Sequence, residues 1–177
     1  MCLKKSFFVG FFCLYATLCA AVTPNIDVQA DIFELDAKTQ EIFASGNVRV
    51  TQKDILMTGK TAHYNQRNQK IMIQGPIQIE KGVMKLSCDS VTAYGKEEII
   101  EAVGGVHFNY LRIKGESDFA TFDRKSQVVV LTGNPKAWQN QDMLTGKSIT
   151  IDLKREKVTT LGKARVVLSL DTLQQKN

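Results

Sequence analysis

The stretch TGNPKAWQNQDMLTGKSITIDLKREKVTTLG, residues 132–162, contains one complete unit of the repeat that decides the fold of this chain. The unit runs from Gly133 to Gly162, and the same interval of 29 residues leads back to three earlier glycines. A fixed period of this length is typical of a protein built from stacked repeats. The glycines in register are Gly46, Gly75, Gly104, Gly133 and Gly162.

Apolar residues recur at fixed positions after each glycine. Two places after the glycine the successive units have Val48, Ile77, Val106, Pro135 and Ala164, and four places after it they have Val50, Ile79, Phe108, Ala137 and Val166. Polar side chains such as Arg49 and Gln78 lie between these two positions. Because apolar and polar residues alternate, each segment is predicted to be a β-strand with one buried face.

The second half of the unit repeats in the same way. A column of small residues, thirteen places after the glycine, consists of Gly59, Cys88, Ser117 and Gly146. Inward positions then follow at Ala62, Val91, Ala120 and Ile149 and at Tyr64, Ala93, Phe122 and Ile151, with Phe33 and Leu35 in a half unit before Gly46. After a polar turn, the strand leading to the next glycine carries Ile42, Ile71, Ile100, Val129 and Val158, and then Ala44, Ile73, Ala102, Leu131 and Thr160.

These patterns predict an all-β, repeat-built and elongated structure. Each unit is expected to hold three or four short strands joined by tight turns, with the glycine at a bend. A unit this small cannot bury its apolar face alone, so stacked units are expected to share a continuous apolar trough or core. No end cap is evident, and exposed strand edges favour end-to-end association. The alternative is that VTPNID and DTLQQKN cover the two ends.

The first 21 residues resemble a secretory signal. A basic start containing Lys4 and Lys5 precedes an apolar run and small residues at Cys19–Ala21, so we expect cleavage near Ala21 and a single domain over residues 22–177. The alternative is an uncleaved anchor, since the apolar run is at the short edge for a membrane span. Removing the two lysines lowers the formal charge from +5 to +3, which does not favour nucleic-acid binding.

No set of residues predicts catalysis, a cofactor or a metal site. His63 and His107 face away from the apolar side by parity and belong to different units, whereas a metal or a base–nucleophile pair needs convergent groups. Cys88 lies in the small-residue column and is interpreted as a buried side chain. Aspartates that recur at one phase, such as Asp123, suit tight turns. We therefore do not expect an enzyme.

The units IFASGNVRVTQKDILMTGKTAHYN and VVVLTGNPKAWQNQDMLTGKSITIDLKREKV resemble the OstA-like family of periplasmic lipopolysaccharide-transport proteins, over roughly residues 26–170. The resemblance implies a twisted antiparallel β-jellyroll, open at both ends. It also implies that lipopolysaccharide crosses the periplasm with the acyl chains of lipid A in the apolar interior. The implied partners are further copies of the chain, head to tail, and related jellyroll domains of inner- and outer-membrane transport components.

Inward-facing apolar residues are the candidate lipid-binding residues. They are Val48, Val50, Ile71, Ile73, Ile77, Ile79, Phe108, Phe122, Val129, Leu131 and Ile149. Small inward residues such as Ala93 and Ala120 indicate an interior that is not completely filled. Two alternatives remain open: an inner-membrane-anchored, LptC-like component, and a structural β-solenoid scaffold that binds no lipid.

Overall fold

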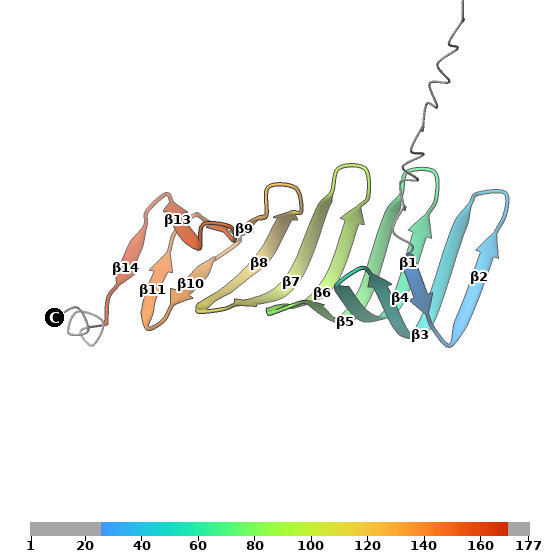
Figure 1. The fold of residues 1–177 in the computed structure, drawn as a ribbon, viewed down its shortest axis with the longest axis horizontal. Coiled ribbons are helices and arrows are strands. Elements are labelled where there is room, and N and C mark those ends of the chain that lie inside the picture. The colour runs from blue at the N-terminus through green and yellow to red at the C-terminus, as the bar shows by residue number, and fades with distance from the viewer. Residues whose placement is uncertain (1–25, 170–177) are drawn as a thin grey trace, which may run out of the picture.

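The computed structural model describes residues 26–169. The expected signal segment, residues 1–21, and the C-terminal DTLQQKN stretch lie outside the described residues. The described part forms an antiparallel sheet of 14 strands, which lie side by side along the long axis of an elongated body (Figure 1). The predicted all-β class is confirmed.

The strands are long in the middle of the sheet and short towards its ends. The long strands are β3 (Glu41–Gln52), β4 (Ile55–Asn65), β5 (Lys70–Lys81), β6 (Met84–Tyr94), β7 (Ile99–Tyr110) and β8 (Ile113–Asp123). The short strands are β1 (Ile26–Gln29), β2 (Ile32–Asp36), β9 (Val128–Thr132), β10 (Lys136–Gln139), β11 (Asp142–Thr145), β12 (Ser148–Asp152), β13 (Lys157–Leu161) and β14 (Arg165–Val167).

All the long strands are interrupted at the same level, along a line that we call the crease. The pairing of β3 with β4 shifts register between Ser45 and Val48, and the pairings from β4 to β8 shift at equivalent positions. The crease passes through the repeat glycines. At Gly133 and Gly162 the chain breaks into separate strands instead of bending as one. The predicted bends at the glycines are therefore confirmed.

Close approach of two backbones explains why glycine occupies the crease. Gly46 has a φ of 76° and Gly133 a φ of 72°, which is costly for residues that carry a Cβ atom. The carbonyl of Gly133 accepts a hydrogen bond of 2.8 Å from the amide of Asp118. A Cβ atom at Gly133 would lie 2.7 Å from the Cβ atom of Asp118, so a side chain there would push the strands apart.

The crease divides the sheet into two layers. Layer 1 contains β2, β9, β12 and β13, and layer 2 contains β1, β10, β11 and β14. Each long strand belongs to both layers; residues 41–45 of β3 pair with β2, and residues 49–52 pair with β1. Apolar side chains from both layers form a single buried cluster. The result is the predicted twisted β-jellyroll, in which one folded sheet encloses its own core.

Two expectations about the units need correction. Each central unit has two long strands bent at the crease, instead of three or four short ones, because the ladder of hydrogen bonds resumes directly after each bulge. Phe33 and Leu35 do lie in register with Ala44 and Ile42 of the inward face. They are nevertheless 49% and 69% exposed, because β2 is the last strand of layer 1 among the described residues.

Five hairpin turns of layer 1, which we call the layer-1 turns, repeat one local structure. In the turn after β2, the Asp36 carboxylate accepts hydrogen bonds from the amides of Lys38 and Thr39, at 2.8 and 3.1 Å. These amides, that of Thr39 foremost, lower the pKa of Asp36, and Asp123 and Asp152 behave alike in their turns. The predicted turn role of these aspartates is confirmed. The turns comprise residues 37–40, 66–69, 95–98, 124–127 and 153–156.

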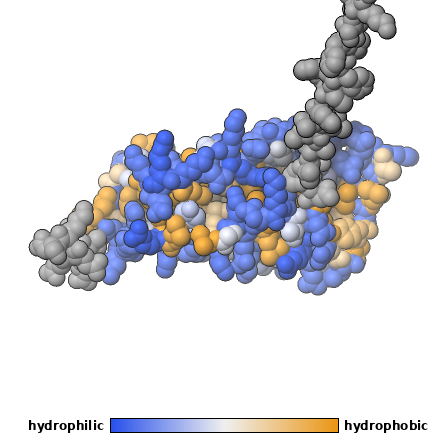
Figure 2. Space-filling model, viewed as in Figure 1, coloured by the Kyte–Doolittle hydropathy of each residue, from blue (hydrophilic) through white to orange (hydrophobic). Residues whose placement is uncertain are grey.

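Both ends of the sheet expose apolar side chains and strand edges. At one end these include Ile32 and Leu35 of β2, and at the other Leu161 of β13 and Val166 of β14. Hydrophobic surface is visible at both ends of the long axis (Figure 2). In residues 26–169, no helix is sufficiently long and apolar to pass through a membrane.

Candidate lipid-binding trough

The structure places all the candidate lipid-binding residues in the interior between the two layers. Leu131 and Ile149 are completely buried, and Phe122 is 6% exposed. The alternation of apolar and polar residues therefore predicted correctly which side chains point into the interior. Most of the interior is filled by these side chains, however, so burial alone does not distinguish a binding surface from an ordinary core. The inward residues of the candidate set are Val48, Val50, Ile71, Ile73, Ile77, Ile79, Phe108, Phe122, Val129, Leu131 and Ile149.

The interior is hollow on the side opposite the crease, at an opening that we call the mouth. A cavity of about 470 Å³ lies there between the layers. Its floor is apolar, with Val50, Ile55 and Met57 from layer 2 and Ile71 and Ile100 from layer 1. Polar residues form its rim: Gln52 and Lys53 on layer 2, and Gln69, Glu98 and Arg124 on layer 1. An apolar floor with a polar rim suits an amphipathic ligand.

Only two of the candidate residues, Val50 and Ile71, line this cavity. The sequence contains a signal for two of the lining residues that were missed. Nine and eleven places after each repeat glycine, the chain is mostly apolar, beginning with Ile55 and Met57. No sequence signal reveals the role of Arg124, because its position opposite layer 2 depends on how the two layers face each other.

Few polar contacts join the layers across the mouth. Nη1 of Arg124 lies 3.5 Å from Oε1 of Gln52, and the hydroxyl of Tyr110 lies 3.5 Å from the carbonyl oxygen of Leu153. Both distances are at the long limit for a hydrogen bond. By contrast, the crease is closed by continuous backbone, so the mouth is the weaker side of the trough.

Small residues along the interior have different surroundings. Ala62, Ala102 and Ala120 are buried by their neighbours, whereas Ala93 is only partly buried and lines the cavity. The hypothesis of an incompletely filled interior therefore holds at Ala93. Cys88 is buried, and burial raises the pKa of its thiol to about 11. The prediction of an unreactive structural cysteine agrees with this pKa, because the thiolate is the reactive form.

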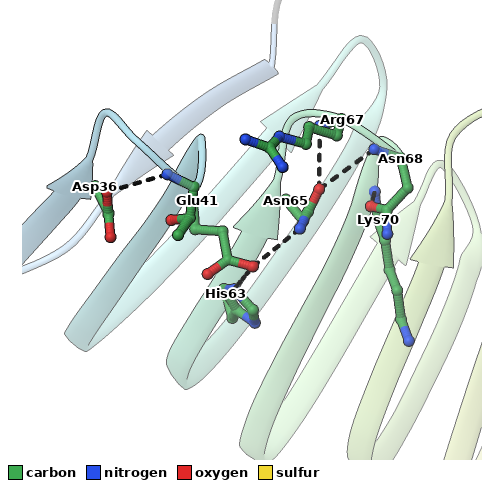
Figure 3. A network of polar contacts seen from close by, with 8 residues as sticks. Asp36, Glu41, His63, Asn65, Arg67, Asn68 and Lys70 are labelled. Atoms are coloured by element: carbon green, nitrogen blue, oxygen red, sulfur yellow. Dashed lines mark hydrogen bonds and ion pairs between the residues drawn. The ribbon is translucent and has the colours of Figure 1, made fainter.

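Both histidines lie on outer faces, as predicted, but each has a carboxylate neighbour. His63 stacks on Phe43 with ring centroids 4.3 Å apart, and its Nε2 atom lies 3.6 Å from Oε1 of Glu41 (Figure 3). Asn65 donates a hydrogen bond of 2.9 Å to the same Glu41 oxygen. His107 lies 3.6 Å from Glu116, far along the sheet. The two histidines do not converge, and no cluster of three or more potential metal ligands occurs within residues 26–169.

Comparison with known protein families shows which family the chain matches. The family described as LptA/(LptD N-terminal domain) LPS transport protein matches residues 57–157, which is more than half of the chain. No curated protein sequence matches significantly. Solved structures that match include that of LptH, described as the LptA homologous periplasmic component of the conserved lipopolysaccharide transport device from Pseudomonas aeruginosa. It is 21% identical, with a TM-score of 0.44, and the alignment covers 82% of this chain and 96% of that chain.

Proposed function

Because the chain belongs to the LptA/LptD N-terminal-domain family of lipopolysaccharide transport proteins, we propose that it binds lipopolysaccharide with the acyl chains between the two layers. The observation that carries this proposal is the cavity at the mouth, with its apolar floor and polar rim. Acyl chains on the floor leave the headgroup at the rim, in water. The candidate residues then serve as the walls along which acyl chains lie.

The energetics favour such shielding. Each methylene group kept out of water stabilises the complex by about 0.8 kcal/mol, so an unshielded glycolipid would cross an aqueous compartment at high cost. The interior around Ile73 and Leu131 is closed. Acyl chains that extend beyond the cavity therefore require the layers to part at the mouth, where few polar contacts join them.

Transport between membranes also requires that modules connect. We propose that copies associate head to tail, and with related jellyroll domains at each membrane, by pairing edge strands of the described sheet: β2 with β13 in layer 1, and β1 with β14 in layer 2. Unpaired edges offer hydrogen-bonding groups to an incoming strand. The apolar side chains of Leu35 at one end and Val166 at the other would be covered by such pairing.

We propose that the protein acts in the periplasm and that residues 1–21 are the signal that directs its export. N-terminal sequencing of the mature protein tests this assignment. A mature chain that starts near Val22 supports a free carrier, and a chain that retains its first residues supports the anchored, LptC-like alternative.

Filling the cavity tests the proposal. Ala93→Trp places an indole ring into the cavity, whereas Thr92→Trp, on the same strand, points away from it. We expect Ala93→Trp to abolish binding of lipopolysaccharide while Thr92→Trp binds as the wild type does. Urea unfolding of both variants establishes that each is folded. Wild-type binding by a folded Ala93→Trp variant would contradict the proposal.

The closed interior favours a second candidate function, a structural scaffold. Ile73, Leu131 and Ile149 have no exposed surface, as in a repeat protein whose core simply holds the stack together. A wild-type protein that self-associates but carries no lipid when purified from its own host would support the scaffold.

A further inference from the structure

The layer-1 turns share a feature that trough binding does not use. Their second position is basic in every turn, with the 29-residue spacing of the repeat. The other positions vary: the third position, for example, is Thr39, Asn68 or Glu97 in successive turns. The hydrogen bonds that shape the turns involve backbone groups and, in four turns, an Asp or Asn side chain, so the turn conformation does not itself require a basic side chain. We call these side chains the basic row: Lys38, Arg67, Lys96, Lys125 and Lys154.

The turns hold the row in a regular arrangement. In four of them an Asp or Asn side chain accepts hydrogen bonds from the amides of the next turn residues, as Asn65 does from Arg67 and Asn68 at 3.0 and 3.3 Å (Figure 3). The last residue of each turn has a positive φ, from 50° to 61°. These residues are Gln40, Gln69, Glu98, Gln127 and Glu156. The same backbone shape thus presents each basic side chain in the same way.

Hydrogen bonds also join each turn to the next. The amide of Gly95 donates to the carbonyl of Gln69 at 3.0 Å, and three equivalent bonds connect the other turns. Arg67 donates to the carbonyl of Lys38 at 2.8 Å. Successive turns are two strands apart, which corresponds to about 10 Å. The basic row is therefore an evenly spaced line on a connected backbone.

The row follows one lip of the mouth. Gln69, Gly95, Glu98 and Arg124, which belong to three successive turns, line the cavity. Lys53 faces them from layer 2. The layer-1 turns stand in a row along the upper edge of the molecule, and this edge is hydrophilic in space-filling view (Figures 1 and 2).

Acidic residues accompany the row, and their placement decides where an anion would bind. The carboxylates of Asp36, Asp123 and Asp152 keep their negative charge while they accept hydrogen bonds from turn amides, so each offsets one basic side chain of its own turn. In the fifth turn Glu156 offsets a second one. Glu97 and Glu98 are exposed and offset Lys96 in the third turn. Positive charge is therefore strongest at Arg67 and in the fourth turn, on both sides of the cavity.

We infer that the basic row binds the phosphate groups of a lipid headgroup at the mouth while the acyl chains lie in the trough; this inference rests on the proposed function. Ammonium and guanidinium groups form charge-assisted hydrogen bonds with phosphate. Each exposed contact is weak and is screened by salt. A line of such contacts nevertheless keeps the headgroup at the rim while it moves from turn to turn.

The test compares two charge variants of the full chain. The row variant is Arg67→Gln/Lys96→Gln/Lys125→Gln/Lys154→Gln. The control variant, Arg49→Gln/Lys114→Gln/Lys136→Gln/Lys163→Gln, removes the same charge from exposed positions away from the mouth. A smaller pair, Lys96→Gln/Lys125→Gln, guards against misfolding, because these two side chains make no hydrogen bond within the described residues. The probes are lipid A, dephosphorylated lipid A and inorganic phosphate.

We expect the row variant to bind lipid A about tenfold more weakly than the wild type does and to bind dephosphorylated lipid A unchanged. The control variant should bind both lipids as the wild type does. Glu97→Gln/Glu98→Gln should bind lipid A more tightly, because it removes repulsion. The inference would be overturned if the row variant lost affinity equally for both lipids, or if it bound lipid A as tightly as the wild type does. Either result would leave trough binding intact.

Two further outcomes are decisive. Row-dependent binding of inorganic phosphate, at an affinity equal to that for lipid A, would show that the row takes free phosphate instead of a lipid headgroup. A wild-type protein that binds neither lipid would overturn the proposed function itself.

Discussion

Arg124 of layer 1 reaches Gln52 of layer 2 across the mouth, with Nη1 3.5 Å from Oε1, although 72 residues separate them in the chain. Both residues belong to the rim of the cavity. A contact at this distance contributes little stability. The layers are thus joined across the mouth by long side-chain contacts instead of continuous backbone, on the side where a ligand would enter.

Holding the mouth closed should prevent loading. We expect Gln52→Cys/Arg124→Cys, cross-linked by a short bis-maleimide, to lose lipopolysaccharide binding, because the layers can no longer part. The buried Cys88 should not react. Binding is measured before and after cross-linking. A control pair on the outer face of layer 2, Thr58→Cys/Gln78→Cys, should bind equally in both states; full binding by the cross-linked mouth pair would contradict the account.

Because the crease is crowded, substituting Gly104 should destabilise the fold more than substituting the adjacent Gly105. A Cβ atom at Gly104 would lie 2.9 Å from the Cβ atom of Asp89, whereas one at Gly105 would meet no atom within 4 Å. Both glycines have a positive φ. We expect Gly104→Ala to lower the free energy of unfolding by about 2 kcal/mol, and Gly105→Ala by less, in urea titrations. Equal losses would show that the backbone angle alone requires glycine.

The turn aspartates should make the free energy of unfolding decrease at low pH. Hydrogen bonds from turn amides lower the pKa of Asp36, Asp123 and Asp152 below the ordinary value of 3.8. Their contribution is therefore present above that value and is lost as the pH falls through it towards the folded pKa. We expect the free energy of unfolding to fall below about pH 4.

The triple variant Asp36→Asn/Asp123→Asn/Asp152→Asn provides the control for acid sensitivity. Asn65 already fills the equivalent position in its own turn, so the fold should persist. The slope of stability against pH below pH 4 should be smaller than in the wild type. Identical slopes would assign the acid sensitivity to other carboxylates.

Local pattern predicted much of this fold from the sequence. The period-two alternation around Val48 and Val50 assigned inward faces correctly, because a strand has only two faces. The glycine spacing located the crease, since few other residues adopt a positive φ at low cost. The resemblance to the OstA-like family is likewise confirmed by the family match.

Other features depend on how distant segments meet. The sequence did not indicate that β3 to β8 continue through the crease, because a bulge and a strand break have the same local composition. The cavity between Met57 and Ile100 and the contact of Gln52 with Arg124 arise only when the layers face each other. The basic row has the 29-residue spacing of the repeat, but nothing in the sequence indicates that it lies along the mouth.

Photo-crosslinking tests most directly whether acyl chains lie between the layers. A benzophenone amino acid is introduced at Ile71 or Ile100, on the floor of the cavity, or at Arg49, on the outer face. The protein is then irradiated with lipopolysaccharide that carries labelled acyl chains. The account predicts label at Ile71 and Ile100 and none at Arg49. Label confined to Arg49, or equal at all positions, would contradict it.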